Sequence, residues 1–275
     1  MAVPLYPYKE RLPAPIYWLY RGLRTILTGL CFVEFWGGTV LVCWLWLPWL
    51  LLWPGTREQK QRRVLKTVGR GFRLFHWTMR KLRLYDRRTP YPVLRPPGVP
   101  ADKPCILVAN HPTLCDTTSI VSLFPNVVAV ARPSLANHPL IKPIVRACGF
   151  IPLGIHIVKD CQDKLAMGFD VLVFPEGTRS PLGGLHPFHR GAFEVAARAK
   201  VPVVLLKLTC EPSVLSKRRP IWKMSDKKAM LTIEPFDVID PGSASSRELC
   251  RAIEQRYREL LGYSQPEMPR ERGTA

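Results

Sequence analysis

Residues 105–261 alternate between short apolar runs and segments with helical periodicity, and this alternation constrains the fold more than any other feature. It predicts an α/β layered domain with a mixed, largely parallel sheet flanked by helices. The expected strands are 105–109, 127–131, 150–155, 170–174, 201–209 and 229–236. The expected helices are 113–124, 138–148, 158–168, 189–199 and 245–261.

A first polar cluster follows the strand 105–109, where Asn110-His111-Pro112 leads to Asp116. Pro112 disfavours a helical conformation at His111, so His111 is expected at the strand-to-helix corner. From a helix that starts there, Asp116 can reach one imidazole nitrogen, and the other nitrogen then faces solvent or substrate. This is a catalytic triad without its nucleophile, which a substrate hydroxyl would supply. An ordinary capping or packing role for the pair is the alternative.

A second polar cluster, Pro175 to Ser180, follows the apolar strand 171–174. Polar residues after two buried strands are typical of an α/β active site. Arg179 suits a phosphate or another anionic headgroup, because a guanidinium group can form two parallel hydrogen bonds to the oxygens of such a group. Gly177 would let the backbone approach a ligand closely. The alternatives are an ion pair for Arg179, a helix-capping role for Glu176 and a simple turn at Ser180-Pro181.

These two clusters together resemble the glycerolipid acyltransferase family, which includes the 1-acyl-glycerol-3-phosphate acyltransferases. The likeness rests on His111-x4-Asp116 and on Phe174-Pro-Glu-Gly-Thr-Arg179, with Val201-Pro202 as a third block. It covers roughly residues 60–240. The family usually carries Gly-x-Ile-Phe-Ile-x-Arg between the two main blocks, whereas Gly149–Ile155 has no arginine here. Since that arginine belongs to the family's acceptor-binding region, the acyl acceptor stays open.

The resemblance implies a membrane-bound O-acyltransferase that uses an acyl thioester, acyl-CoA or acyl-ACP, as co-substrate and needs no other cofactor. The acceptor would be the hydroxyl of a lysophosphatidic acid-type lipid. The alternative acceptors are another lysophospholipid or a lyso-amino-acid lipid such as lyso-ornithine lipid. The alternative to an enzyme is a non-catalytic membrane adaptor. His111 would act as general base oriented by Asp116, and the predicted substrate-binding residues are Glu176, Gly177, Thr178 and Arg179.

Other classes of enzyme lack their signatures. The chain has no Gly-x-Ser-x-Gly and no His-Glu-x-x-His, and its eight cysteines form no Cys-x-x-Cys pair. We therefore expect buried free thiols in a reducing compartment, no metal site and no nucleophilic role for Cys115. We expect His76 on the surface, and we interpret the remaining four histidines as bystanders, with a minor headgroup role open for His189.

The apolar stretch 25–53 predicts a membrane segment, since Glu34 is its only charged residue. A tilted span and a re-entrant segment bent at Gly37-Gly38 or Pro48 are both open, as is a buried core helix. No cleavable signal peptide is expected. The basic residues that follow favour a cytoplasmic catalytic domain, on the inner membrane if the source is bacterial.

The formal net charge of +19 indicates an anionic partner. Residues 57–84 predict a basic amphipathic helix that lies on anionic headgroups or packs its apolar stripe on the domain. No nucleic-acid-binding signature accompanies the charge, and the basic loop 213–228 fits headgroups, an acidic carrier or plain solubility. The expected organisation is an anchoring segment (1–56), the basic helix and a Pro-rich linker (57–103), a catalytic domain (104–262) and a polar tail (263–275).

Overall fold

The computed structural model describes residues 8–89, 99–100, 103–216 and 225–263. The expected Pro-rich linker and polar tail lie largely outside these residues, as does half of the basic loop 213–228. The helical elements in chain order are α1 (Ala14–Leu41), a π-helical segment (Val42–Trp46), α2 (Leu47–Leu52), α3 (Arg57–Lys81), α4 (Asp116–Leu123), α5 (Pro133–Ala136), α6 (Lys142–Ala147), α7 (Ile157–Ala166), α8 (Gly191–Ala199) and α9 (Ser246–Leu261). The strands are β1 (Tyr85–Arg88), β2 (Ile106–Ala109), β3 (Val127–Ala131), β4 (Ile151–Pro152), β5 (Asp170–Val173), β6 (Val203–Glu211) and β7 (Ala229–Ile239).

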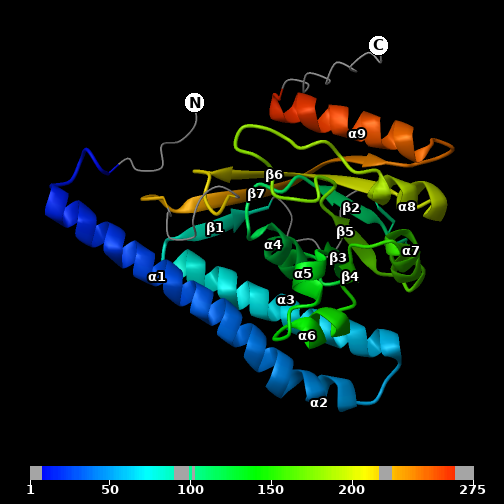
Figure 1. The fold of residues 1–275 in the computed structure, drawn as a ribbon, viewed down its shortest axis with the longest axis horizontal. Coiled ribbons are helices and arrows are strands. Elements are labelled where there is room, and N and C mark those ends of the chain that lie inside the picture. The colour runs from blue at the N-terminus through cyan, green and yellow to red at the C-terminus, as the bar shows by residue number, and fades with distance from the viewer. Residues whose placement is uncertain (1–7, 90–98, 101–102, 217–224, 264–275) are drawn as a thin grey trace, which may run out of the picture.

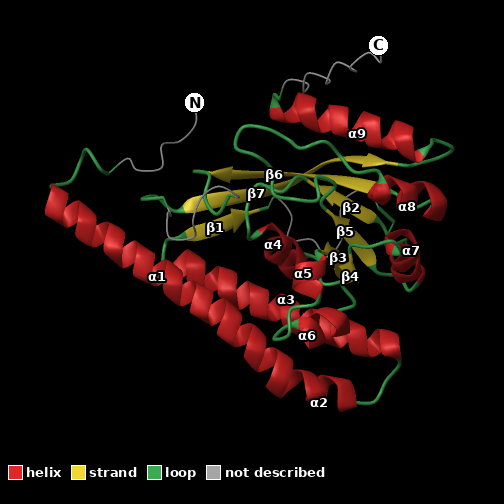
Figure 2. Ribbon diagram, in the orientation of Figure 1, coloured by secondary structure: helices red, strands yellow, loops and turns green. Residues whose placement is uncertain are grey.

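The strands form one seven-stranded sheet in the order β1-β7-β6-β2-β5-β3-β4, with helices on both faces (Figures 1 and 2). Every neighbouring pair is parallel except β6 and β7, which are antiparallel. The predicted mixed, largely parallel α/β sheet is therefore confirmed.

Strand β2 lies at the centre of the sheet and contributes to two hydrophobic cores. Ile106 and Val108 belong to the core that also holds Phe193 of α8 and Tyr257 of α9. Leu107 and Ala109 belong to the core on the opposite face, together with residues of α1, α3 and α4. Burial on both faces is why this strand is a continuous apolar run rather than an alternating one.

The apolar N-terminal segment forms a helical run over Ala14–Leu52 that is long and apolar enough to cross a membrane. It starts well before the expected Thr25 and passes through Gly37-Gly38 without a break. The irregularity is the π-helical segment before Pro48. A proline ring clashes with the carbonyl four residues earlier, and a widened π turn relieves such a clash. Glu34, the charged residue in the stretch, accepts a hydrogen bond from the Thr78 hydroxyl of α3 at 2.9 Å.

Helix α3 starts with a reciprocal capping box between Thr56 and Gln59. Its apolar stripe packs on the domain: Leu65, Phe75 and Met79 are buried. Arg62 is also held by the protein, since its guanidinium donates to the Met167 carbonyl at 3.2 Å. Other basic residues of the helix, Lys66, Arg70, Arg73, Arg80 and Lys81, remain exposed.

Several elements differ from the sequence-based expectation, and the strand expected over 150–155 is reduced to Ile151–Pro152. Strand β1 was not expected, because Tyr85–Arg88 is polar and pairs only with the distant β7. The helix expected over 138–148 is shortened to α6, which has Pro143 in its first turn, and a separate short helix, α5, precedes it with Pro133 in its first turn. Helix α4 begins at Asp116 instead of 113, because residues 112–115 form a turn that the Asp116 carboxylate closes.

Candidate active site

The candidate site is built at the carboxyl end of β2. Directly after the strand, the Asn110 side chain bonds both backbone groups of Leu208 on β6, with each distance 2.8 Å. This amide continues the β2–β6 pairing by one position, where the backbone of β2 turns away. His111 therefore leaves the sheet from a fixed point.

His111 and Asp116 meet at this corner. The His111 Nδ1 lies 2.7 Å from the Asp116 Oδ2, and the Asp116 side chain is fully buried. The same carboxylate accepts the Thr113 backbone N–H at 2.8 Å and the Thr113 hydroxyl at 2.5 Å. With Nδ1–H donating to the carboxylate, the lone pair of Nε2 is free to take a proton.

The imidazole is also fixed by stacking. Its ring lies on the Phe174 ring, with the centroids 4.2 Å apart and the planes 20° from parallel. Phe174 comes directly after β5, the parallel neighbour of β2. The two polar clusters predicted from the sequence thus lie side by side, at the same edge of the sheet.

Glu176 ties the second cluster to the first. Its Oε1 accepts the His111 backbone N–H at 3.2 Å and the Ser180 hydroxyl at 2.5 Å, and its Oε2 accepts the His186 N–H at 2.9 Å. Ser180 N–H in turn donates to the His111 carbonyl at 2.8 Å. Burial raises the pKa of the Glu176 carboxyl, against the effect of these donors. The geometry makes Glu176 a positioning residue for the His111 backbone, and Ser180 is more than the simple turn residue that we expected.

Gly177 has φ +62°, in the left-handed region that favours glycine. A Cβ there would also lie 3.1 Å from the His189 ring. Its carbonyl accepts a hydrogen bond from the Arg132 guanidinium at 2.9 Å, and Thr178 follows it half-buried.

Two guanidinium groups lie by this turn. Arg179 Nη1 donates to the Leu215 carbonyl at 2.9 Å, and burial and then the nearby Arg132 lower the pKa of Arg179. Among the described residues, no salt bridge involves either arginine. Sequence reasoning missed Arg132, although it directly follows an apolar strand, β3, as the other site residues follow β2 and β5.

Two further residues near the site are buried. His76 was expected on the surface but is 4% exposed. Its Nε2 lies 3.0 Å from the Thr118 hydroxyl, and burial, with a smaller effect of Arg87, lowers its pKa to about 3. Cys115 is buried beside Asp116, and burial raises the pKa of its thiol, which disfavours the thiolate. Among the residues that the structure describes, no three His, Cys, Asp or Glu side chains form a group that could hold a metal ion.

Residues 94–206, which contain both polar clusters of the candidate site, match the family model described as Acyltransferase. This match and the relatives described below support the resemblance to the glycerolipid acyltransferase family that the two motifs indicated.

Relatives of this family come from plants, animals and bacteria. The chain is 34% identical over 115 residues to the chloroplastic 1-acyl-sn-glycerol-3-phosphate acyltransferase BAT2 of Brassica napus, an alignment that covers 39% of this chain and 33% of that protein. It is 26% identical over 219 residues to the human 1-acyl-sn-glycerol-3-phosphate acyltransferase beta, covering 76% and 73%. The chain therefore spans about a third of the length of the plant relative.

A solved structure shares the fold. The crystal structure of the 1-acyl-sn-glycerophosphate acyltransferase PlsC from Thermotoga maritima superposes with a TM-score of 0.68 at 24% identity. The superposition covers 89% of this chain and all of that one.

Proposed function

We propose that the protein transfers a fatty acyl group from an acyl thioester to the free hydroxyl of a lysophosphatidic acid-type lipid. The observation that carries this proposal is the 2.7 Å contact between His111 Nδ1 and the buried Asp116 carboxylate, next to two guanidinium groups. The relatives named above add support, since their names describe 1-acyl-sn-glycerol-3-phosphate acyltransferases.

In this proposal His111 Nε2 accepts the proton of the acceptor hydroxyl while the oxygen attacks the thioester carbonyl. A C–O bond forms, the C–S bond breaks, and the imidazolium returns the proton to the departing thiolate. The Asp116 carboxylate fixes the tautomer and stabilises the positive ring between these two steps. The protein itself forms no covalent intermediate.

The acceptor phosphate would bind Arg179 and Arg132. A guanidinium group can form a bidentate pair of hydrogen bonds with two phosphate oxygens. Among the described residues, neither arginine takes part in a salt bridge. The Gly177 turn, which accepts from Arg132, would bring the backbone amides of Thr178 and Arg179 near the same oxygens. Glu176 would contribute by holding the His111 backbone.

We further propose that the protein acts at a membrane, with its catalytic domain on the cytoplasmic face. The long apolar run over Ala14–Leu52 supports the membrane, and the basic residues after it support this orientation. Both acyl-CoA and acyl-ACP remain candidate donors.

A different lyso-acceptor is the second candidate, and one position favours it. Ile155 is 93% exposed where the family usually carries an arginine. An acceptor with a less charged headgroup, such as a lysophospholipid or lyso-ornithine lipid, would not need that guanidinium.

The test is acyl transfer by the purified protein in detergent, with lysophosphatidic acid, lysophosphatidylcholine and lyso-ornithine lipid compared as acceptors. We expect lysophosphatidic acid to react fastest, and His111→Ala to lower kcat by about 100-fold or more, the usual contribution of a general base. His156→Ala is the matched control, because His156 is exposed before α7. Equal activity of His111→Ala and wild type would refute the proposed base, and no transfer with either thioester donor would favour the adaptor.

A further inference from the structure

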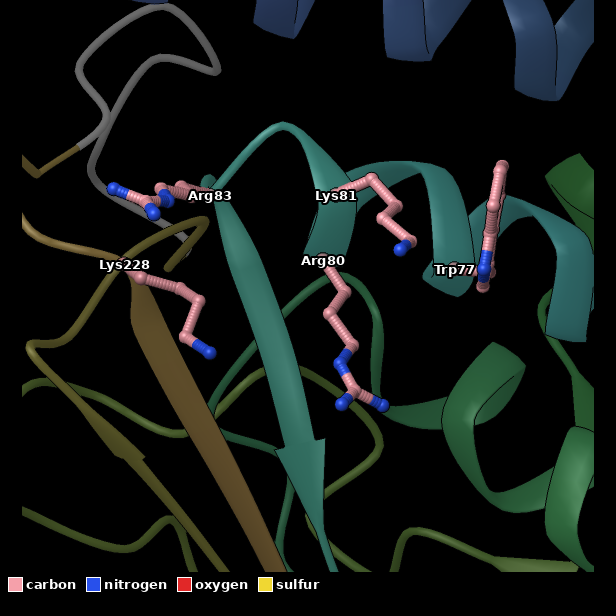
Figure 3. A pocket seen from close by; sticks show the side chains of 5 residues that line it. All are labelled: Trp77, Arg80, Lys81, Arg83 and Lys228. Carbon is pink, nitrogen blue, oxygen red and sulfur yellow. The ribbon is translucent and has the colours of Figure 1, made fainter.

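A second cationic site lies away from His111, at the carboxyl end of α3. Five residues line a cavity of about 450 Å³: Trp77, Arg80, Lys81, Arg83 and Lys228. Figure 3 shows their side chains around one hollow, with three from the end of α3, Arg83 from the turn before β1 and Lys228 from the residue before β7. We call these five residues the cationic cleft.

The cationic cleft carries more positive charge than the protein neutralises. Asp86 is the acid that pairs with it, with its Oδ2 2.9 Å from Lys228 Nζ and 3.6 Å from Arg80 Nε. Lys81 Nζ lies over the Trp77 ring, 5.7 Å from its centroid. Neither Lys81 nor Arg83 takes part in a salt bridge of the described residues. An anion could therefore bind without displacing a carboxylate.

The topology brings the cationic cleft to the same edge of the sheet as the candidate active site. Strand β6 runs parallel to β2 and continues from Leu206, the partner of Ala109, to Glu211, so it ends beyond β2 on the side of the sheet where His111 lies. Strand β7 is antiparallel to β6 and β1 is parallel to β7, so both of these strands start at that edge. Arg83 lies two residues before β1, and Lys228 directly precedes β7. Three strand spacings separate β1 from β2, which is about 14 Å.

Helix α1, which contacts the backbone beside the cationic cleft, carries exposed apolar residues. Arg24 of α1 donates to the carbonyls of Arg83 at 3.2 Å and Lys227 at 3.3 Å, which fixes this part of α1 beside the cleft. The neighbouring α1 residues Leu19 and Leu23 are 77% and 53% exposed. Trp77 is itself 55% exposed, and tryptophan favours the headgroup level of a bilayer.

We propose that the cationic cleft binds the phosphate of an anionic membrane phospholipid that is not the substrate. A lipid fits better than an acidic carrier protein, because it supplies both an anion for the cleft and acyl chains for the apolar residues of α1. Such a lipid would hold the catalytic edge of the sheet toward the bilayer. This inference rests on the membrane association proposed above, and not on the acyl-transfer chemistry.

The test measures binding of dihexanoylphosphatidylglycerol to the full-length protein in neutral detergent by calorimetry, with inorganic phosphate as the soluble comparison. Each basic side chain near a lipid phosphate contributes about 1 kcal/mol, so loss of two such side chains lowers the affinity of the protein for the lipid by about 30-fold. We expect that loss for Lys81→Gln/Arg83→Gln. Lys66→Gln/Arg70→Gln removes the same charge from exposed positions of α3 outside the cleft, and we expect little change. Arg132→Gln/Arg179→Gln tests whether the probe occupies the candidate active site instead.

Each other outcome overturns the proposal. Equal losses in the cleft variant and the α3 control would indicate a diffuse charge effect. A loss of affinity only in the Arg132/Arg179 variant would assign the probe to the candidate active site. Equal affinities for the lipid probe and for inorganic phosphate would indicate a free-phosphate site. Displacement of the probe by acyl-ACP would identify a carrier surface. Since the readout is binding, it does not depend on whether the protein transfers acyl groups.

Discussion

Asp116→Asn is the sharpest perturbation of the candidate site, because it removes one charge and almost no volume. The Asp116 Oδ2 accepts both His111 Nδ1–H at 2.7 Å and the Thr113 backbone N–H at 2.8 Å. In the variant the Thr113 N–H requires an acceptor, so the amide oxygen should occupy the Oδ2 position. The amide nitrogen would then face the Thr113 hydroxyl, which can accept a hydrogen bond. The His111 tautomer is therefore retained.

What the variant loses is the attraction between carboxylate and imidazolium. Two unit charges about 4 Å apart attract by about 4 kcal/mol at an effective dielectric constant of about 20. With roughly half of the charge developed in the transition state, the loss is about 2 kcal/mol, or about 30-fold in kcat.

The assay is kcat for acyl transfer at saturating lysophosphatidic acid and thioester, with thermal unfolding as the measure of folding. Asp163→Asn is the matched control, because Asp163 is an exposed acid on α7. An unchanged kcat would refute the electrostatic role of Asp116. A loss far beyond about 1,000-fold in a folded variant would refute the retained tautomer, since it exceeds the whole attraction estimated above.

Three other variants test separate parts of the structure. Arg179→Gln should lower kcat/KM for lysophosphatidic acid by about 10-fold or more, the effect of a charged hydrogen bond, and should change transfer to monoacylglycerol, which lacks the phosphate, much less. Burial lowers the pKa of His76 in the folded protein to about 3 from an ordinary value of about 6.5, so the stability it contributes is full above about pH 6.5 and falls as the pH drops toward 3. Between about pH 7 and pH 5, wild type should therefore lose about 2 kcal/mol more stability than His76→Gln in thermal unfolding; equal losses would contradict the assignment. Gly177→Ala should lower kcat more than Gly183→Ala, because both residues have positive φ but only a Cβ at 177 meets the His189 ring; equal kcat values would exclude that contact as a factor.

The sequence predicted most of the central sheet because its strands are buried on both faces and thus read as apolar runs. Strand β1 escaped prediction for the opposite reason: it is an edge strand, and Asp86 and Arg87 are only half-buried. Its pairing with β7 depends on residues more than 140 positions away, which no local pattern encodes.

The candidate site was predictable where a motif follows a strand and unpredictable where contacts are made by the folded chain. His111, Asp116 and Arg179 were found in this way. The Ser180 hydroxyl owes its role to the Glu176 carboxylate and the His111 backbone, and that arrangement exists only after β2 and β5 have paired. The burial of His76 likewise requires α3 to pack on α4.

Helix α1 has a practical consequence for work on this protein. Its buried positions, Tyr17, Arg24, Thr28 and Cys31, form a stripe that packs on the rest of the chain, and Arg24 satisfies two carbonyls that precede β1 and β7. Removing the segment to obtain a water-soluble fragment would strip one side of a hydrophobic core and leave those carbonyls without their donor. We expect such a truncated chain to aggregate, so purification strategies should keep the apolar helix and choose a detergent that covers it.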